Sequence, residues 1–369
     1  MRGHVRKRGS SWTVVYDEGC DEHGRRRQRS KGGFPTRRDA QAFLSDVLSR
    51  LGDGSYAQPS KQTLGDYLTR EWLPAIEPTV RPLTFTQYRS VVRIRIVPTL
   101  GHLRLQALTG GHLNTLYREL EQGGLSVATR RQTHAVLRRA LRDAVRWGRL
   151  IRNPADMADP PAAARTRVQS WTAKELGRFL EHVRSNRLFS LWRLAATTGL
   201  RRGELAGLTW RCLDLENARV SVEQQLIPTR GGASFGPPKS TRSRRTVALD
   251  AQTVDVLLEH RAVQLAERAF AGNAYLDGDL VFADELGGPI HPQRLTESFG
   301  QLRKAAGLPT GTLHVLRHTA ATLALTDGVP VHIVAARMGD NPNTVLSTYA
   351  HLLPQSDELA AERVAALLA

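Results

Sequence analysis

The chain has 369 residues, among them 52 Lys and Arg and 35 Asp and Glu, so its formal charge is +17 at pH 7. This length exceeds what one compact hydrophobic core usually holds and predicts two or three domains. The excess of positive charge favours a polyanionic partner, nucleic acid above all, because Lys and Arg contacts to phosphates supply most non-specific affinity.

The pattern of apolar residues argues against membranes and secretion. No stretch reaches the roughly 20 apolar residues that a membrane-spanning helix needs, and residues 1–6 lack the apolar core of a secretory signal. Cys20 and Cys212 are the only cysteines, too few for a disulfide framework or a structural zinc site. These features predict a cytoplasmic protein without membrane contact.

Residues 1–57 are predicted to form a module of three strands and one helix. Residues 11–16 are rich in strand formers, residues 25–31 are expected to return as a second strand, and a third short strand is expected before Phe34. A Thr-x-x-Asp capping box at Thr36 then opens a helix.

This module carries a basic run. Seven basic residues and no acidic residue lie between positions 25 and 38. Solvated charged edges are common on sheets, but the adjacent aromatic strand favours a sheet that lies against DNA. Arg25, Arg26 and Arg27 are therefore candidate DNA contacts.

Residues 58–62 are expected to be a linker, and residues 63–152 a helical domain. Apolar periodicity predicts a compact bundle of four helices with short Gly and Pro connections. The helices are expected near residues 64–73, 84–96, 113–120 and 126–147.

The fourth helix and the two residues after it, 126–149, combine an apolar stripe with seven arginines and a single acid, Asp143. Solvated arginines on a helix surface are ordinary, but this ratio favours contact with a duplex backbone. Arg130, Arg131 and Arg138 are the candidates. Residues 153–168, which contain Pro160-Pro161 and further arginines, are then expected to form an extended basic tether to a last domain at residues 169–369.

The last domain contains an arginine between two glycines. Gly199 and Gly203 bracket Arg201 and allow the backbone to approach a ligand closely. Glu204 can hold the guanidinium by a charge-assisted pair. Such a pair is more often structural, so this motif alone is a weak signal.

A basic segment follows between expected strands at residues 220–222 and 245–249. Five basic residues and no acid lie between positions 229 and 245. Lys239, at the expected tip of a hairpin, can enter a DNA groove beside a phosphate, with Arg242 and Arg244 as further candidate DNA contacts. A disordered basic loop is the alternative.

Residues 312–351 bring the remaining groups. His314 and Arg317 are three apart, so on a helix both side chains project from one face and can bind a phosphate oxygen. Tyr349, delivered by a second helix and a turn, can attack the phosphorus. A zinc site at His314 and His318 is disfavoured because position 315 is Val, where zinc hydrolases place an acid.

Taken together, these segments resemble the tyrosine recombinase (phage-type integrase) family over essentially the whole chain. The Thr-Gly-Leu-Arg-Arg-Gly-Glu-Leu box, the Pro-Lys-Ser-Thr-Arg-Ser-Arg-Arg segment, the His-x-x-Arg box and the Thr-Tyr-Ala-His segment occur in the family's order. The resemblance implies five catalytic residues: Arg201, Lys239, His314, Arg317 and the nucleophile Tyr349. It also implies an arm-type DNA-binding module, a SAM-like core-binding domain and an α+β catalytic domain, in a multidomain, mainly α protein with small sheets.

The implied reaction is the cutting and rejoining of DNA through a 3′-phosphotyrosyl intermediate, without ATP, metal or other cofactor. The implied partners are double-stranded DNA at core and arm sites, a homotetramer on DNA, and accessory DNA-bending and excision proteins. The tail, residues 356–369, is expected to be a short helix that packs on its own domain or on a neighbour. Integration or excision of a mobile element is the expected role.

One position departs from the family pattern. Asp340 stands where the family usually has His, sometimes Trp. A carboxylate beside a phosphate is unfavourable unless it is protonated or faces a cation. We therefore expect Asp340 to be structural and to bind amides of the following turn or an arginine. The alternative functions are a non-catalytic DNA-binding regulator of the same fold, favoured by Asp340 alone, and a resolvase or topoisomerase with the same chemistry.

Overall fold

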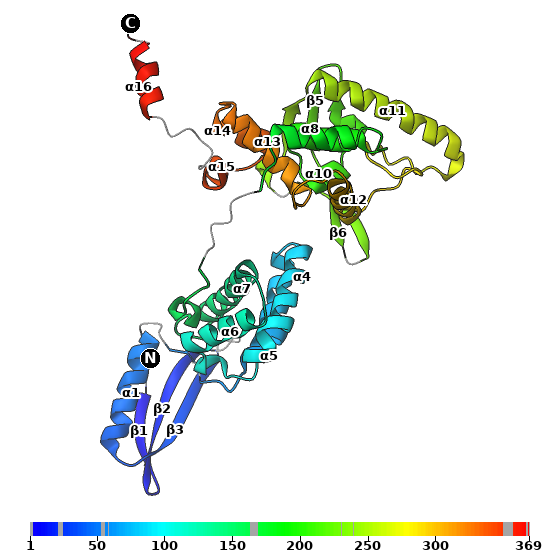
Figure 1. Cartoon of the computed structure of the whole chain (residues 1–369). Helices are drawn as coiled ribbons and strands as arrows, with labels where there is room; N and C mark the ends of the chain where they lie inside the picture. Colours follow the sequence, from blue (N-terminus) through cyan, green and yellow to red (C-terminus); the bar gives the residue numbers. More distant parts are fainter. Residues whose placement is uncertain are drawn as a thin grey trace. The chain divides into compact units, whose positions relative to one another are not determined.

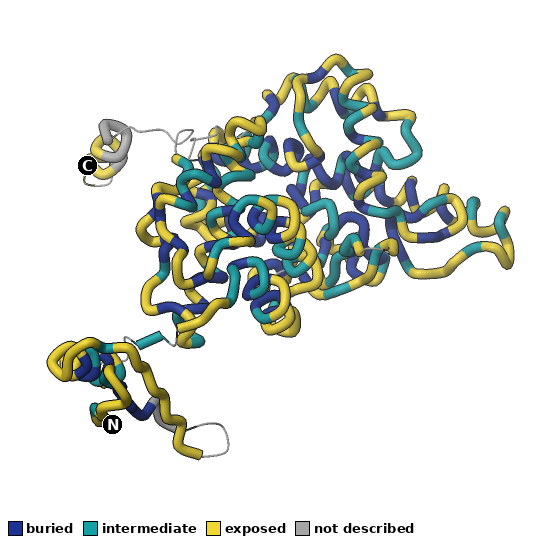
Figure 2. Tube along the Cα trace, turned by 90° about the horizontal axis from the view of Figure 1, so that it is seen from below, coloured by how far each residue is buried: buried dark blue, intermediate teal, exposed yellow. Residues whose placement is uncertain are grey.

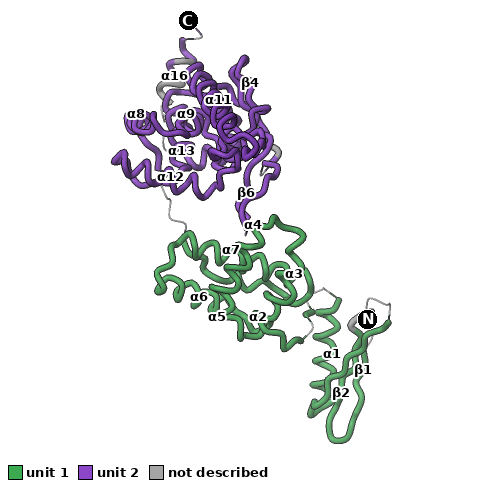
Figure 3. Tube along the Cα trace, turned by 90° about the vertical axis from the view of Figure 1, so that its right-hand side faces the viewer, with its two compact units in different colours: residues 1–165 green, residues 166–369 purple. Residues whose placement is uncertain are grey.

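The computed structural model describes residues 3–20, 25–52, 56–57, 59–162, 169–229, 231–238, 240–349, 357–366 and 368. The chain divides into two compact units, residues 1–165 and 166–369 (Figure 3). The described elements are mainly helices, with small antiparallel sheets, which confirms the expected fold class. Among these helices, none combines the length and the apolar character that a membrane span requires.

The first unit begins with a three-stranded antiparallel sheet in the order β1 (Gly3–Arg8), β2 (Ser11–Cys20) and β3 (Arg26–Phe34). Helix α1 (Arg37–Gly52) packs on the sheet through Ala40, Leu44 and Val47, against Val14 and Tyr16 of β2 (Figure 1).

The number of strands was predicted correctly, but the place of the third strand was wrong. Residues 26–34 form one strand, and the third strand is β1, at the start of the chain. β1 has one apolar residue besides its glycine, and its side chains are mostly exposed, so no alternating pattern marks it. Backbone pairing to β2, through a turn at Gly9 with φ of 62°, holds this edge strand.

Four helical segments follow, as predicted, and two of them are assembled from consecutive short helices. They are α2 (Leu64–Asp66) continued by a π-helical turn (Tyr67–Trp72) and α3 (Leu73–Ile76); α4 (Pro82–Val91) continued by a second such turn (Val92–Ile96) and α5 (Val97–Leu100); α6 (Gly110–Gln122); and α7 (Val127–Arg146).

Their apolar faces share one core, and the exposed positions face outward (Figure 2). Tyr67, Trp72, Leu113 and Leu137 are fully buried there. Asp143, the one acid of α7, is also buried and accepts a hydrogen bond from Trp72 Nε1 at 2.9 Å. This acid is therefore part of the bundle core.

The expected extended tether at residues 153–168 is wrong for its first part. Residues Pro154–Met157 form a short 3-10 helix that Asn153 caps. Ala155 and Ala158 are buried in the bundle core, because these small apolar side chains fit between α6 and α7. Residues 163–168 lie outside the described residues.

The second unit is built on a core of aromatic residues, Trp171, Phe179, Trp192 and Phe299. Its helices are α8 (Ala173–His182), α9 (Phe189–Thr198), α10 (Arg202–Ala206), α11 (Ala251–Ala271), α12 (Pro292–Ala305), α13 (His314–Thr326), α14 (Val331–Met338), α15 (Pro342–Tyr349) and α16 (Asp357–Ala366). A capping box formed by Thr172 and Glu175 begins α8.

Two small sheets flank these helices. β4 (Leu213–Asp214), β5 (Arg219–Val222) and β8 (Arg245–Ala248) form one antiparallel sheet, and β6 (Gln225–Thr229) pairs with β7 (Gly232–Gly236) in a separate hairpin. The strands expected at 220–222 and 245–249 are thus confirmed and paired. In the hairpin between them Thr229 lies opposite Gly232, and this hairpin precedes the basic segment whose tip was expected at Lys239.

A second apolar cluster joins α13, α14 and α15. It consists of buried residues that lie on all three helices, namely Ala321, Leu325, Val334, Ala335, Met338, Val345 and Tyr349. Tyr349 therefore reaches its position as part of a packed core.

Candidate active site

Arg201 lies at the junction of α9 and α10. Gly199 ends α9 in the left-handed conformation, with φ of 65°, and Arg201 then precedes α10 in an extended conformation. A Cβ at position 199 would stand 3.1 Å from Met338 Cε and 3.6 Å from Arg317 Cγ. Glycine is needed here for the backbone angle and for the close approach of α13 and α14.

Glu204 holds Arg201 in place from within α10. This buried carboxylate accepts hydrogen bonds at 2.9 Å from Arg201 Nη1 and from Arg245 Nη2. Burial alone would raise the pKa of Glu204, but the hydrogen bonds and charges of Arg245 and Arg201 outweigh it and hold this pKa below its ordinary value. The predicted pairing of Glu204 with Arg201 is confirmed.

Arg317, in the first turns of α13, is buried and ties two helix ends together. Its Nη1 donates to the carbonyl oxygen of Gly199 at 2.6 Å, and its Nη2 donates to that of Met338 at 2.9 Å. Burial and then the charge of Arg201 lower the pKa of Arg317, and Asp340 opposes them. An arginine nevertheless stays charged near neutral pH.

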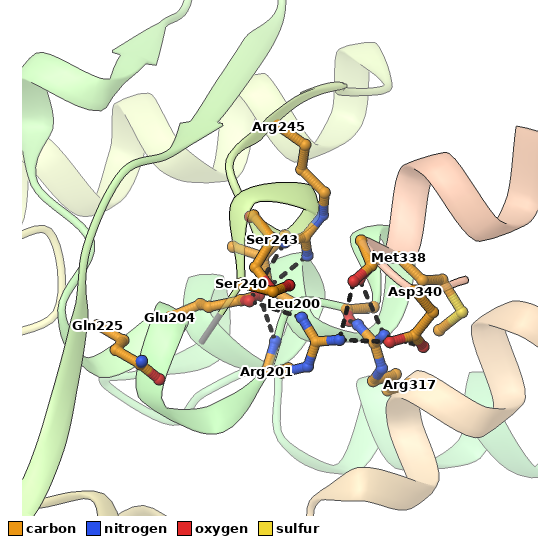
Figure 4. A network of polar contacts seen from close by, with 12 residues as sticks. Leu200, Arg201, Glu204, Gln225, Ser240, Ser243, Arg245, Arg317, Met338 and Asp340 are labelled. Carbon is orange, nitrogen blue, oxygen red and sulfur yellow. Dashed lines mark hydrogen bonds and ion pairs between the residues drawn. The ribbon is translucent and has the colours of Figure 1, made fainter. Parts of the chain in front are cut away.

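Asp340 bridges the two guanidinium groups (Figure 4). One carboxylate oxygen accepts a hydrogen bond from Arg201 Nη2, and the other accepts one from Arg317 Nη2 at 2.6 Å. Of the two alternatives expected for Asp340, turn amides or an arginine, the contacts that the structure describes are with arginines. An anion of the chain itself thus lies between the two cations and offsets part of their charge.

Tyr349, the last residue of α15, lies close to the same cluster. It is 5% exposed, and its Oη is 2.6 Å from Nδ1 of His318. Burial raises the pKa of Tyr349 to about 12, with a lowering effect of Arg317 and a raising effect of Asp340. The phenol thus lies where the charges of Arg317 and Asp340 act on it.

His314 begins α13, one turn before His318, and the two rings are 6.4 Å apart. Desolvation and then the charges of Arg317, Arg202 and Arg201 hold the pKa of His314 below its ordinary value. The residue stays exposed to solvent. A neutral imidazole at this place can donate a hydrogen bond to an incoming anion.

Lys239, the fifth candidate, lies outside the described residues. Its neighbours Arg242 and Arg244 are exposed, as DNA contacts must be. Arg245 was not assigned a role from the sequence, although its side chain is 6% exposed and binds Glu204. Strand alternation was the available signal, because it places Arg245 on the same face of β8 as the buried Val247.

The candidate DNA contacts of the bundle are engaged within their own unit. Arg130 is mostly buried and pairs with Glu121 at 2.7 Å, and Arg138 pairs with Asp156 at 2.7 Å. Arg131 donates to the carbonyl oxygen of Pro161 at 2.9 Å. Arg131 and Arg138 remain exposed, whereas the burial of Arg130 favours a structural role.

The candidate contacts of the sheet module, Arg25, Arg26 and Arg27, are exposed in or beside β3. Arg26 also forms an ion pair with Asp17 of β2. Pairing of this kind at the surface leaves a guanidinium accessible to a phosphate.

Three family models match the chain: the phage integrase family over residues 169–356, an arm DNA-binding domain over residues 4–51, and a phage integrase N-terminal SAM-like domain over residues 63–120. A tyrosine recombinase XerC-like protein of Caldanaerobacter subterraneus subsp. tengcongensis is 28% identical over 97% of this chain and 97% of its own. An integrase of Saccharopolyspora erythraea is 27% identical over 89% of this chain and 88% of its own.

Solved structures show the same fold. The Tn1549 transposon integrase, in complex with a circular intermediate DNA, has a TM-score of 0.69 at 21% identity, covering 84% of this chain and 100% of that one. A lambda integrase dimer bound to a core site has a TM-score of 0.57 at 18% identity, covering 94% and 93%. Since the phage integrase model alone matches just over half of the residues, the chain belongs to the phage integrase family of tyrosine recombinases.

Proposed function

We propose that this enzyme is a site-specific DNA recombinase, an integrase that cuts and rejoins DNA through a 3′-phosphotyrosyl intermediate. The observation that carries the proposal is the convergence of Arg201 and Arg317 on one carboxylate, with the phenol of Tyr349 on the adjoining helix. Two planar donor forks that share one anion are suited to the two non-bridging oxygens of a phosphodiester.

In the proposed reaction, a DNA phosphate replaces the Asp340 carboxylate between the two arginines. Arg201 and Arg317 then stabilise the charge that grows on the non-bridging oxygens in the transition state. His314, exposed at the start of α13, adds a hydrogen bond to the same phosphate. Tyr349 attacks the phosphorus, and Lys239 protonates the departing 5′ oxygen.

The proposed partners follow from the modular chain. The basic sheet module would bind arm-type sites, and the helical domain and the catalytic unit would bind the core site. Among the structural neighbours is a lambda integrase tetramer bound to a Holliday junction, which supports a homotetramer on DNA for this chain. We also propose accessory bending and excision proteins, a cytoplasmic location, and a mobile element as the DNA that is moved.

Covalent trapping tests the proposal. The full-length protein is incubated with nicked duplex DNA that carries the flanks of its own gene, and the expected result is a protein–DNA adduct that resists denaturant. Tyr349→Phe should bind this DNA and form no adduct, because it lacks the attacking oxygen. Tyr275→Phe, another tyrosine of the same unit, is the matched control and should form the adduct as the wild type does.

A non-catalytic DNA-binding regulator is the second candidate, because Asp340 occupies both arginines. The same experiment separates the two functions. Specific binding to the flanking DNA without any adduct in the wild type would favour the regulator and contradict the recombinase.

A further inference from the structure

The nucleophile candidate has a hydrogen-bonding partner to which no role is yet assigned. His318 Nδ1 lies 2.6 Å from Tyr349 Oη, and the two rings are 6.0 Å apart. Tyr349 is nearly fully buried at the end of α15, in a cluster with residues of α13 and α14. The imidazole of His318 is therefore placed to accept the phenol proton.

The charges around His318 favour its neutral form. His314 and Arg317 face it from its own helix, Asp340 from the segment after α14, and Tyr349 from α15. Desolvation is the largest effect on the pKa of His318 and lowers it. The charges of His314 and Arg317 lower this pKa further, and Asp340 opposes them. A neutral imidazole has one nitrogen with a free lone pair, which can accept a proton.

We propose that His318 is the general base that accepts the phenol proton of Tyr349, an inference that rests on the proposed recombinase chemistry. As Oη forms its bond to phosphorus, the Oη–H bond breaks and the proton moves to Nδ1 of His318. The P–O5′ bond breaks at the same phosphorus, and its electron pair leaves with the 5′ oxygen. The 5′ oxygen takes up the proton of Lys239, as in the proposed reaction. In rejoining, the 5′ hydroxyl gives that proton back to Lys239 as it attacks, and the imidazolium returns its proton to the departing tyrosine oxygen.

The two histidines of α13 have different neighbours, which indicates different roles. His314 forms no hydrogen bond with the side chains that the structure describes, and it lies at the exposed start of the helix next to Arg317. His318, one turn further, faces the phenol. His314 is therefore assigned to the phosphate and His318 to the nucleophile.

The test measures single-turnover adduct formation across about pH 7 to 9, with DNA whose 5′ bridging oxygen is sulfur. This leaving group departs without a proton, so only deprotonation of the nucleophile is observed. Wild-type protein should show a rate nearly independent of pH. His318→Gln keeps a hydrogen-bonding side chain that cannot take up a proton, and its rate should fall by about 10²–10⁴.

In the variant, hydroxide has to remove the phenol proton, so the rate should rise about tenfold per pH unit below the pKa of the tyrosine. His332→Gln, an exposed histidine on α14, is the control and should behave as the wild type does. DNA binding and cooperative unfolding check that both variants are folded.

Two results would overturn the inference. The first is a His318→Gln rate within about threefold of the wild-type rate, which is far less than a general base contributes. The second is a wild-type rate that itself rises tenfold per pH unit, and this result counts even if the variant does not fold. A wild-type protein that forms no adduct at any pH would instead remove the proposed function itself.

Discussion

The carboxylate of Asp340 bridges two arginines and offsets part of their charge. Arg317 is 7% exposed at its side chain and Asp340 is 28% exposed, so water screens these charges only in part. In the proposed reaction, DNA brings its own anion to this place. We therefore expect the free protein to need Asp340 for electrostatic balance and the DNA-bound protein to do without it.

Asp340→Ala should lower the stability of the free protein by about 1–3 kcal/mol, the cost of leaving a charged hydrogen-bonding group without its partner. The loss should shrink when DNA is bound, because a phosphate takes the place of the carboxylate, and adduct formation should persist. Thermal unfolding with and without DNA measures this, with Asp327→Ala as the control. Lost cleavage with intact folding and DNA binding would contradict a structural role.

Glu204→Gln removes the buried charge that Arg201 and Arg245 share, and should destabilise the catalytic unit by about 3–5 kcal/mol. The folded-state pKa of Glu204 lies below its unfolded value near ~4.3. Its stabilisation is therefore complete above that value and is lost as the pH falls through the folded-state pKa. The variant should lack this part of the acid sensitivity.

Hydrogen exchange at amides of α9 and α13, measured at neutral pH and about pH 4, reports this unit alone. Glu259→Gln, an exposed acid on α11, is the control. Equal stability of Glu204→Gln and the wild type at neutral pH would show that the ion pairs at Glu204 do not support the site.

At the scale of elements, local signals predicted much of the fold. A capping box, helical periodicity and motif spacing located α1, α13 and the four helical segments of the bundle, because each carries its signal within a few residues. β1 was missed because an exposed edge strand lacks an apolar pattern. The burial of residues 154–158 depends on contacts with α6 and α7, which no local pattern reveals.

The candidate site also combines features with local signals and features that depend on distant contacts. Motif spacing identified four candidate residues, Arg201, Arg317, His314 and Tyr349, and their catalytic roles remain predictions. The bridging by Asp340 and the contact of His318 with Tyr349 join segments far apart in the chain. Such contacts depend on how α13, α14 and α15 pack together. The sequence therefore offered an arginine only as one of two alternative partners of Asp340, and it did not reveal the contact of His318.

The tail, which comprises α16 and Leu368 after it, leaves apolar side chains open to solvent. Val364 is 59% exposed and Leu368 is 84% exposed, whereas an apolar helix face is normally covered. In the proposed tetramer, a neighbouring protomer would cover it. The side chains of Leu359 and Leu367 lie outside the described residues.

Removal of residues 357–369 should therefore reduce complete recombination more than it reduces adduct formation on a single site. Recombination needs several protomers that contact one another, whereas cleavage of nicked DNA needs the active site of one protomer. Parallel assays on paired and single sites measure the difference. Equal losses in both assays would argue against packing of the tail on a neighbour.

At the scale of the whole molecule, two units with an excess of positive charge belong to one chain, which is suited to holding a long duplex at more than one place. The DNA-binding regions only matter to recombination if the catalytic unit forms a covalent bond. The atom that forms the covalent bond to the DNA phosphate therefore decides whether the chain acts as a recombinase.

Peptide mapping of the trapped adduct by mass spectrometry identifies this atom. After nuclease and protease digestion, we expect a nucleotide joined through its 3′ phosphate to Tyr349, and a free 5′ hydroxyl on the released strand. A nucleotide on any other residue, or a wild-type protein that binds its DNA and carries none, would contradict it.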